Sequence, residues 1–105
     1  NKNKKIIVNL AINYGSRDEI VEACKKINNK INIQSLSKKL YTRNLPNPDI
    51  LIRTGGRKRL SNFMLWQLAY TEIYFTDKLW PDFNGRDFEK IINNFKKVKR
   101  NFGSI

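Results

Sequence analysis

The stretch PDILIRTGGRKRLSNFMLWQ, residues 48–67, is the most informative part of the sequence for predicting the fold. Its apolar start, Asp-Ile-Leu-Ile, is typical of a short buried strand, and Gly55 and Gly56 end that strand. The part from Ser61 to about Tyr70 is apolar on nearly every side, which predicts a helix buried on several faces. We therefore expect a strand, a cationic loop and a helix whose first turn begins at Ser61.

Strands and helices alternate along the rest of the chain. Residues 6–12 predict a buried strand that is stopped at Gly15, and residues 72–76 predict a further strand. Ser16 and Glu19 have the spacing of a capping box, and the helix that they start has an apolar face made of Ile20, Cys24, Ile27 and Ile31. Residues 34–44 predict a shorter helix or a loop.

The last predicted element is a helix from about Asn84 to Gly103, with an apolar stripe of Phe88, Ile91, Ile92, Phe95 and Val98. The order strand, helix, strand, helix, strand, helix predicts an α/β fold, with an open, mostly parallel sheet and helices on both faces. At 105 residues with 40% hydrophobic content, the chain has room for one small domain.

The composition permits an anionic partner without identifying one. The formal net charge is +12, but Lys, Asn and Ile make up 41 of the 105 residues, a bias expected of an AT-rich coding sequence. Several lysines, such as Lys96 and Lys97, fall where a solvated helix face is expected. The absence of histidine argues against zinc sites and Ser-His or Cys-His nucleophiles, and the single cysteine, Cys24, excludes an intrachain disulfide.

The loop after the strand at residues 49–52 carries the chemistry. Four cations, Arg53, Arg57, Lys58 and Arg59, surround it together with the hydroxyl of Ser61. A guanidinium fork binds two phosphate oxygens at once, and a helix N-terminus adds unpaired N–H donors. The loop lacks the Gly-Lys-Ser/Thr ending of a Walker A loop and the glycine spacing of a dinucleotide-binding turn. Spacing alone supports a phosphate site and a solvated basic loop about equally.

The stretch as a whole resembles the signature region of cis-prenyltransferases of the undecaprenyl diphosphate synthase type. The similarity covers nearly the whole chain and is weakest between residues 28 and 44. The segments that carry it are residues 48–56, 59–67, 70–75, 80–83 and 13–17.

The resemblance implies an Mg²⁺-dependent transferase that condenses isopentenyl diphosphate with an allylic diphosphate to give a polyprenyl diphosphate. Arg53, Arg59 and Ser61 would hold the diphosphate of isopentenyl diphosphate, and Glu72 would bind the metal. Without the resemblance, Glu72 is an ordinary strand-edge carboxylate. Hard carboxylate oxygens close to a diphosphate suit Mg²⁺, so the implied roles agree with the chemistry.

Two positions depart from the family pattern. Arg57 stands where the family commonly has an acidic residue, and Lys58 stands where some members carry a histidine linked to the metal site. The loop is therefore more positive than the resemblance predicts. This charge would tighten diphosphate binding, loosen Mg²⁺ binding, or mark a subunit that has lost catalysis.

The resemblance implies a second half. Members of the family are roughly twice this long, and their first strand ends in a loop with an aspartate that binds the allylic diphosphate and Mg²⁺. No such segment precedes Asn1, and there is no initiator methionine. We therefore expect residues 1–105 to be the C-terminal part of a single domain whose N-terminal half is absent, without a catalytic residue of its own.

The resemblance also implies a homodimer, with Trp66 or Phe75 at its interface, and peripheral membrane association through the lipid product. No run of eighteen apolar residues occurs and the first five residues lack the apolar segment of a signal peptide, so we expect a cytoplasmic protein. Two other functions stay open: a non-catalytic partner subunit of a heteromeric prenyltransferase and, third, a nucleic-acid-binding module. We expect no nucleic-acid partner.

Overall fold

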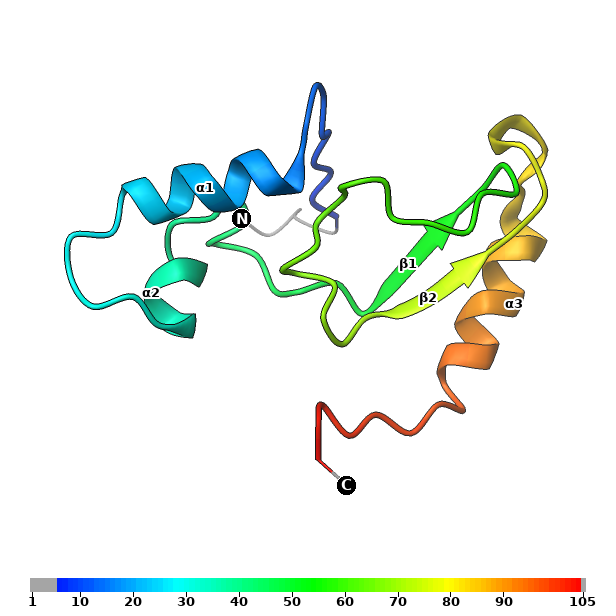
Figure 1. Ribbon diagram of the computed structural model, residues 1–105. Helices are drawn as coiled ribbons and strands as arrows, with labels where there is room; N and C mark the ends of the chain where they lie inside the picture. Colours follow the sequence, from blue (N-terminus) through cyan, green and yellow to red (C-terminus); the bar gives the residue numbers. More distant parts are fainter. Residues whose placement is uncertain (1–5, 105) are drawn as a thin grey trace.

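The computed structural model describes residues 6–104, and in this part of the chain two parallel strands form a sheet with helices to either side (Figure 1). The α/β class with a parallel sheet is confirmed, as are strands close to the two predicted at residues 49–52 and 72–76. The elements in chain order are α1 (Ser16–Lys25), α2 (Ile33–Ser37), β1 (Ile50–Arg53), β2 (Glu72–Phe75), the 3-10 helix η1 (Trp80–Asp82) and α3 (Gly85–Phe95).

The register of the sheet determines which side chains share a face. Ile50 is paired with Glu72 at the start of the strands, and Arg53 is paired with Phe75 at their end. Paired residues of neighbouring strands point to the same face, and side chains alternate along a strand. Arg53 and Phe75 therefore lie on one face of the sheet, and Ile50 and Glu72 lie on the other.

The apolar core lies between α1, α2 and the second half of the β1–β2 connection. Trp66 donates a hydrogen bond from Nε1 to Ser37 Oγ at 3.2 Å and is partly buried against this core. A tryptophan predicted at a dimer interface is thus held inside its own chain. The buried members of the core are Ala23, Leu36 and Leu40, and Ile20, Ile27 and Trp66 pack against them.

Helix α1 does not begin with the predicted capping box. Gly15 is its N-cap residue, and no side chain at that position caps the helix. Ser16 and Glu19 are buried instead, at 0% and 1% exposure, and bind groups far along the chain. Cys24, predicted on the apolar face, is exposed, because Ala23 takes the buried position beside α2.

The predicted strand over residues 6–12 is wrong. This segment has no regular secondary structure, and the side chains of Ile6, Val8 and Ile12 are 76–82% exposed. A strand forms through ladder hydrogen bonds with a neighbour, and among residues 6–104 the sheet consists of β1 and β2 alone. The Cα radius of gyration, 16.0 Å, exceeds the roughly 13 Å of a compact domain of this length. Much apolar surface is therefore open.

The predicted helix from Ser61 to Tyr70 is also wrong. Ser61, Asn62 and Met64 have φ values of +49°, +64° and +47°, whereas an α-helix needs φ near −60°. The segment is a series of turns. An apolar run without a polar face does not distinguish a helix from buried turns, so the sequence pattern was ambiguous here.

Helix α3 starts as predicted and ends early. Asn84 accepts hydrogen bonds from the backbone N–H groups of Arg86 and Asp87, and the Asp87 side chain bonds back to Asn84 N, which completes a capping box. The helix stops at Phe95 and not near Gly103. Beyond it, Arg100 packs over the Phe95 ring and binds the Asp49 carboxylate at 2.7 Å, which turns the chain back toward the sheet. Among the described residues, no helix is long and apolar enough to cross a membrane.

Candidate functional site

The cationic loop follows β1 at the carboxyl end of the sheet. Gly55 and Gly56 have φ values of +89° and +78°, a region that residues with side chains rarely adopt. Their N–H groups donate to the carbonyls of Lys78 at 2.8 Å and Thr76 at 3.0 Å. The paired glycines therefore turn the chain tightly against the segment that follows β2, and this turn fixes where Arg53 leaves the strand.

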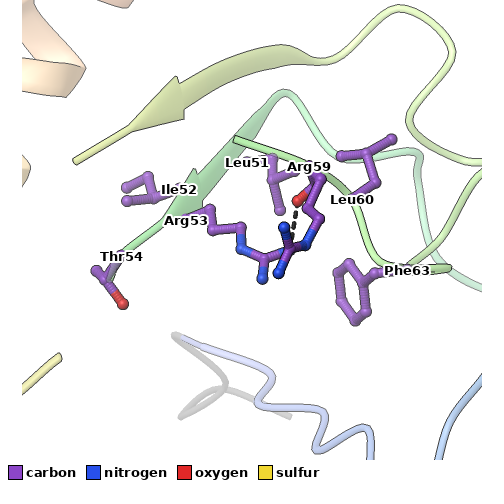
Figure 2. Close-up of a pocket in the computed structure, with 7 residues that line it drawn as sticks. All are labelled: Leu51, Ile52, Arg53, Thr54, Arg59, Leu60 and Phe63. Atoms are coloured by element: carbon purple, nitrogen blue, oxygen red, sulfur yellow. Dashed lines mark hydrogen bonds between the residues drawn. The ribbon is translucent and has the colours of Figure 1, made fainter. Parts of the chain in front are cut away.

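Arg53 joins the two ends of the loop. Its Nη1 donates to the backbone carbonyl of Arg59 (Figure 2). The same nitrogen donates to Ser61 Oγ at 3.1 Å. The structure thus brings together all three residues predicted to hold a diphosphate. Ser61 contributes as an acceptor for Arg53 and not as the cap of a helix, since no helix follows it.

Arg53 and Arg59 line one open cavity of about 330 Å³. Figure 2 shows both side chains on the same side of the loop, with the ring of Phe63 at the border of the cavity. The other lining residues are apolar or neutral: Leu51, Ile52, Thr54 and Leu60. Two guanidinium groups in a cavity without a lining carboxylate form a site for an anion with several oxygens, such as a phosphate or diphosphate.

A second, mostly apolar cavity adjoins the first. It has a volume of about 440 Å³ and is lined by residues 9–14, by Tyr41 and the residues around Pro46, and by Phe63 and Met64. Phe63 lines both cavities. The cationic lining of the first cavity and the mostly apolar lining of the second therefore have Phe63 in common, a combination that suits a molecule with an anionic head and a hydrocarbon tail.

The structure does not bring Glu72 to the arginines. Glu72 lies at the start of β2, opposite Ile50, whereas Arg53 lies at the end of β1 and on the other face. Three residues along a strand span roughly 10 Å. Glu72 instead lines a separate cleft of about 280 Å³ together with Lys99 and Arg100. An acidic residue, Asp77, does lie beside the loop. Its carboxylate would be 3.3 Å from the Cβ of any side chain that replaced Gly56.

The described residues offer few metal ligands close together. Among residues 6–104, no three His, Cys, Asp or Glu side chains gather so that they could hold a metal ion. Asp49 lies close to Glu72, but its carboxylate forms a salt bridge with the guanidinium of Arg100 at 2.7 Å. Mg²⁺ is usually held by one or two carboxylates together with water and substrate phosphates, so Glu72 would supply one ligand and the others would come from outside these residues.

A buried network around Glu19 was not predicted from the sequence. Glu19 accepts hydrogen bonds from Gln67 Nε2 at 3.2 Å, from the backbone N–H of Tyr41 at 2.7 Å and from the hydroxyl of Tyr14. Gln67 also donates to Thr42 Oγ1 at 3.0 Å. The sequence held no signal for it, because the spacing of Ser16 and Glu19 also fits a capping box, and only the structure shows that Glu19 is buried and must find other donors.

This network perturbs one titration. Burial, aided by the hydrogen bond to Glu19, raises the pKa of Tyr14 from 10.0 to about 12. The hydroxyl therefore keeps its proton in the neutral range and serves as a donor. Tyr14 also lines the apolar cavity and packs edge-to-face on Phe63 with 5.6 Å between ring centroids, so the network reaches the boundary of the site.

Comparison with known proteins places this loop in a family. The prenyltransferase family model described as undecaprenyl diphosphate synthase matches residues 1–103. The isoprenyl transferase of Aquifex aeolicus is 48% identical over 106 residues, which cover 97% of this chain and 46% of that protein. The isoprenyl transferase of Treponema denticola is 52% identical over 99 residues, 90% of this chain and 44% of the relative. The chain thus spans about half the length of the curated relatives that it matches.

Two solved structures share the fold at substantial identity. A probable undecaprenyl diphosphate synthase from Campylobacter jejuni superimposes with a TM-score of 0.84 at 42% identity, covering 91% of this chain and 47% of that one. Lavandulyl diphosphate synthase from Lavandula x intermedia, in complex with dimethylallyl diphosphate, gives 0.79 at 40% identity, covering 87% and 44%. With the match over residues 1–103, these similarities show that the chain belongs to the undecaprenyl diphosphate synthase family of prenyltransferases.

Proposed function

We propose that the intact protein is a cis-prenyltransferase that condenses isopentenyl diphosphate with an allylic diphosphate to form a polyprenyl diphosphate, and that this chain is its C-terminal half and supplies the site for isopentenyl diphosphate. The observation that carries the proposal is the pair of adjoining cavities, one lined by Arg53 and Arg59 and the other apolar, with Phe63 in common. An isoprenoid diphosphate has this amphiphilic character.

The arginines act through charge and orientation. Arg53 and Arg59 hold diphosphate oxygens, and Ser61 keeps the Arg53 guanidinium in place through the 3.1 Å hydrogen bond to Nη1. A guanidinium carries five N–H donors, so this bond leaves Arg53 donors for the substrate. Holding the diphosphate positions the alkene of the same molecule for attack, which removes much of the entropic cost of the reaction.

Magnesium dependence is proposed on the family resemblance, with Glu72 as one ligand. Bound Mg²⁺ would neutralise the charge that develops on a leaving diphosphate. The described residues place Glu72 at the start of β2, at the other end of the sheet from Arg53. The same observation favours one alternative, a non-catalytic partner subunit that contributes the cationic cavity to a heteromeric prenyltransferase.

We further propose that the intact protein is a cytoplasmic homodimer and that it meets the membrane through its lipid product. Ile73 and Phe75 lie on one face of β2 and are 40% and 39% exposed, so this face has apolar area for a contact between copies. Trp66, the other residue predicted at the interface, is partly buried against the core of its own chain and so offers less surface for such a contact. Sedimentation of the intact protein as a monomer at micromolar concentration would contradict the dimer.

The test of the function is steady-state kinetics of the intact protein with Arg53→Ala and Arg59→Ala. A charge-assisted contact to phosphate is worth roughly 1.5–3 kcal/mol. Each change should therefore lower kcat/KM for isopentenyl diphosphate about tenfold to a hundredfold. Isopentenyl diphosphate is varied at saturating allylic substrate, after each variant is shown to be folded.

Lys96→Ala and Lys97→Ala are the matched controls, because both remove one exposed positive charge at the end of α3, away from the cavity. They should leave kcat/KM almost unchanged. If the arginine variants behave like the lysine variants, the cationic loop is a solvated surface and the proposed function is wrong. Magnesium-dependent turnover by the intact protein separates the enzyme from the non-catalytic subunit.

A further inference from the structure

Helix α1 is tied to the β1–β2 connection at Asn62. The N–H of Ser16 donates to the backbone carbonyl of Asn62 at 2.8 Å, and the N–H of Arg17 donates to Asn62 Oδ1 at 2.9 Å. Three residues further on, the N–H of Leu65 donates to Ser16 Oγ at 2.9 Å. One asparagine thus bonds both of the first two backbone N–H groups of a helix that begins 46 residues earlier in the chain.

These bonds replace a local cap. The first N–H groups of a helix have no partner within it and usually bond to a side chain at the N-cap position. In α1 that position is Gly15, which has no side chain to offer. Asn62 therefore caps α1 from a distant part of the sequence, and the helix N-terminus in return fixes the position of Asn62.

The neighbour of Asn62 in the chain is Ser61, the acceptor for Arg53. Ser61 and Asn62 have φ values of +49° and +64°, so the backbone leaves the cap in an uncommon conformation and aims the Ser61 hydroxyl at Arg53 Nη1, 3.1 Å away. Asparagine tolerates positive φ better than most residues. The contacts run without a break from α1 through Asn62 and Ser61 to the guanidinium of Arg53.

Gly15 is fitted to this arrangement. A Cβ at Gly15 would lie 3.0 Å from Asn62 Nδ2, closer than ordinary contact, while the φ of Gly15 is −141°, which any residue adopts. The glycine is therefore needed for space and not for its backbone freedom. Gly15→Ala should displace the Asn62 side chain without changing its chemistry.

We propose that Asn62 is a positioning residue for the diphosphate site: by capping α1 it holds Ser61, and through Ser61 it holds Arg53, in the geometry that binds isopentenyl diphosphate. This inference rests on the proposed function. It differs from a purely structural role, which would lower stability and leave the affinity of the folded protein for each substrate unchanged.

The experiment measures equilibrium binding of isopentenyl diphosphate, and KM for both substrates, in the intact protein with Asn62→Gly, Asn62→Asp and Gly15→Ala. Glycine keeps the positive φ but removes Oδ1, and aspartate keeps an acceptor for the N–H of Arg17. We expect Asn62→Gly and Gly15→Ala to weaken isopentenyl diphosphate binding about fivefold, the effect of losing one ordinary hydrogen bond. KM for the allylic substrate should not change, and Asn62→Asp should retain most of the affinity.

The matched control is Asn84→Gly, which removes the same kind of cap from α3, where Asn84 accepts from Arg86 N and Asp87 N. It should lower stability without changing isopentenyl diphosphate affinity. Unchanged affinity in Asn62→Gly and Gly15→Ala, while Arg53→Ala loses it, overturns the positioning role and leaves the proposed function intact. If Arg53→Ala also binds normally, the proposed function fails with it. If Asn62→Gly does not fold, Gly15→Ala decides.

Discussion

The two halves of the β1–β2 connection are built in opposite ways. Residues 55–59 are exposed, and the backbone N–H groups of Gly55 and Gly56 bond to the segment after β2. Residues 61–68 are bonded to α1 and its surroundings, and Gln67 and Leu68 are 2% and 6% exposed. The first half carries the cations and the second half carries the buried contacts.

The contrast between the two halves shows how a loop can hold a ligand in a defined geometry. Functional groups are often on loops, but they need support from groups whose own positions are locked. Ser61 lies at the junction of the two halves and bonds to Arg53 at the end of β1. Changes in the anchored half should therefore lower stability, and changes in the exposed half should lower substrate use alone.

The largest effect on stability is expected from Glu19→Ala, which breaks the anchored half. It leaves the N–H of Tyr41, the amide of Gln67 and the hydroxyl of Tyr14 without their acceptor. A buried donor without a partner costs about 1–3 kcal/mol. We expect the free energy of unfolding of the intact protein to fall by roughly 3 kcal/mol, measured by urea denaturation.

The control for this change is Glu22→Ala, an exposed glutamate on the same helix that pairs with Lys25 at 3.5 Å. Exposed pairs of this kind contribute roughly 0–1 kcal/mol, so its free energy of unfolding should stay close to that of the parent protein. Equal losses in the two variants would show that the buried network does not anchor the connection.

A smaller effect is expected from Ser61→Ala, which touches the junction. Removing the hydroxyl takes one hydrogen bond from Arg53, and a bond of this kind is worth about 1 kcal/mol, or roughly fivefold in kcat/KM for isopentenyl diphosphate. Because Ser61 does not cap a helix, Ser61→Ala should not show the loss in the free energy of unfolding that removing a helix cap would cause.

Ser16→Ala is the comparison for that variant. Its hydroxyl is buried at 0% exposure and accepts from Leu65 N at 2.9 Å, within the anchored half. Its loss should lower the free energy of unfolding by roughly 1–2 kcal/mol. A result in which both serine variants change stability and substrate use alike would remove the distinction between the two halves.

The sequence predicted the parts of the fold that are fixed by local chemistry. The short apolar strand between Pro48 and the Gly55-Gly56 pair was found, as was the cap at Asn84, because turn and cap residues act over a few positions. Arg53, Arg59 and Ser61 were predicted as site residues through a resemblance. The structure brings them together, and their role in binding a diphosphate stays a prediction.

The predictions that were wrong have a common physical cause, which is contact between residues that are far apart along the chain. A strand at residues 6–12 needs a partner strand, and the local sequence does not reveal whether one is present. The segment from Ser61 forms turns and not a helix, and in these turns Asn62 bonds to α1. Glu19 has the spacing of a capping box, but its partners lie 22 and 48 residues away. Local spacing cannot reveal which of two uses a buried carboxylate has.

The smallest expected effect is a pH dependence from Tyr14, at the edge of the anchored half. Burial raises its pKa from 10.0 to about 12 in the folded chain. Between these values the unfolded state has lost a proton that the folded state keeps, so the free energy of unfolding falls as the pH rises through this window and is unaffected by Tyr14 below it. The change is modest because the ring is only partly buried.

Urea denaturation of the intact protein at about pH 9 and about pH 11 should therefore show a stability difference between wild type and Tyr14→Phe that shrinks at the higher pH. Tyr70→Phe, at an exposed tyrosine, is the control for titration elsewhere. A difference that is the same at both pH values would mean that burial and Glu19 do not raise the pKa of Tyr14 in solution, and Tyr14 would then not belong to the buried network.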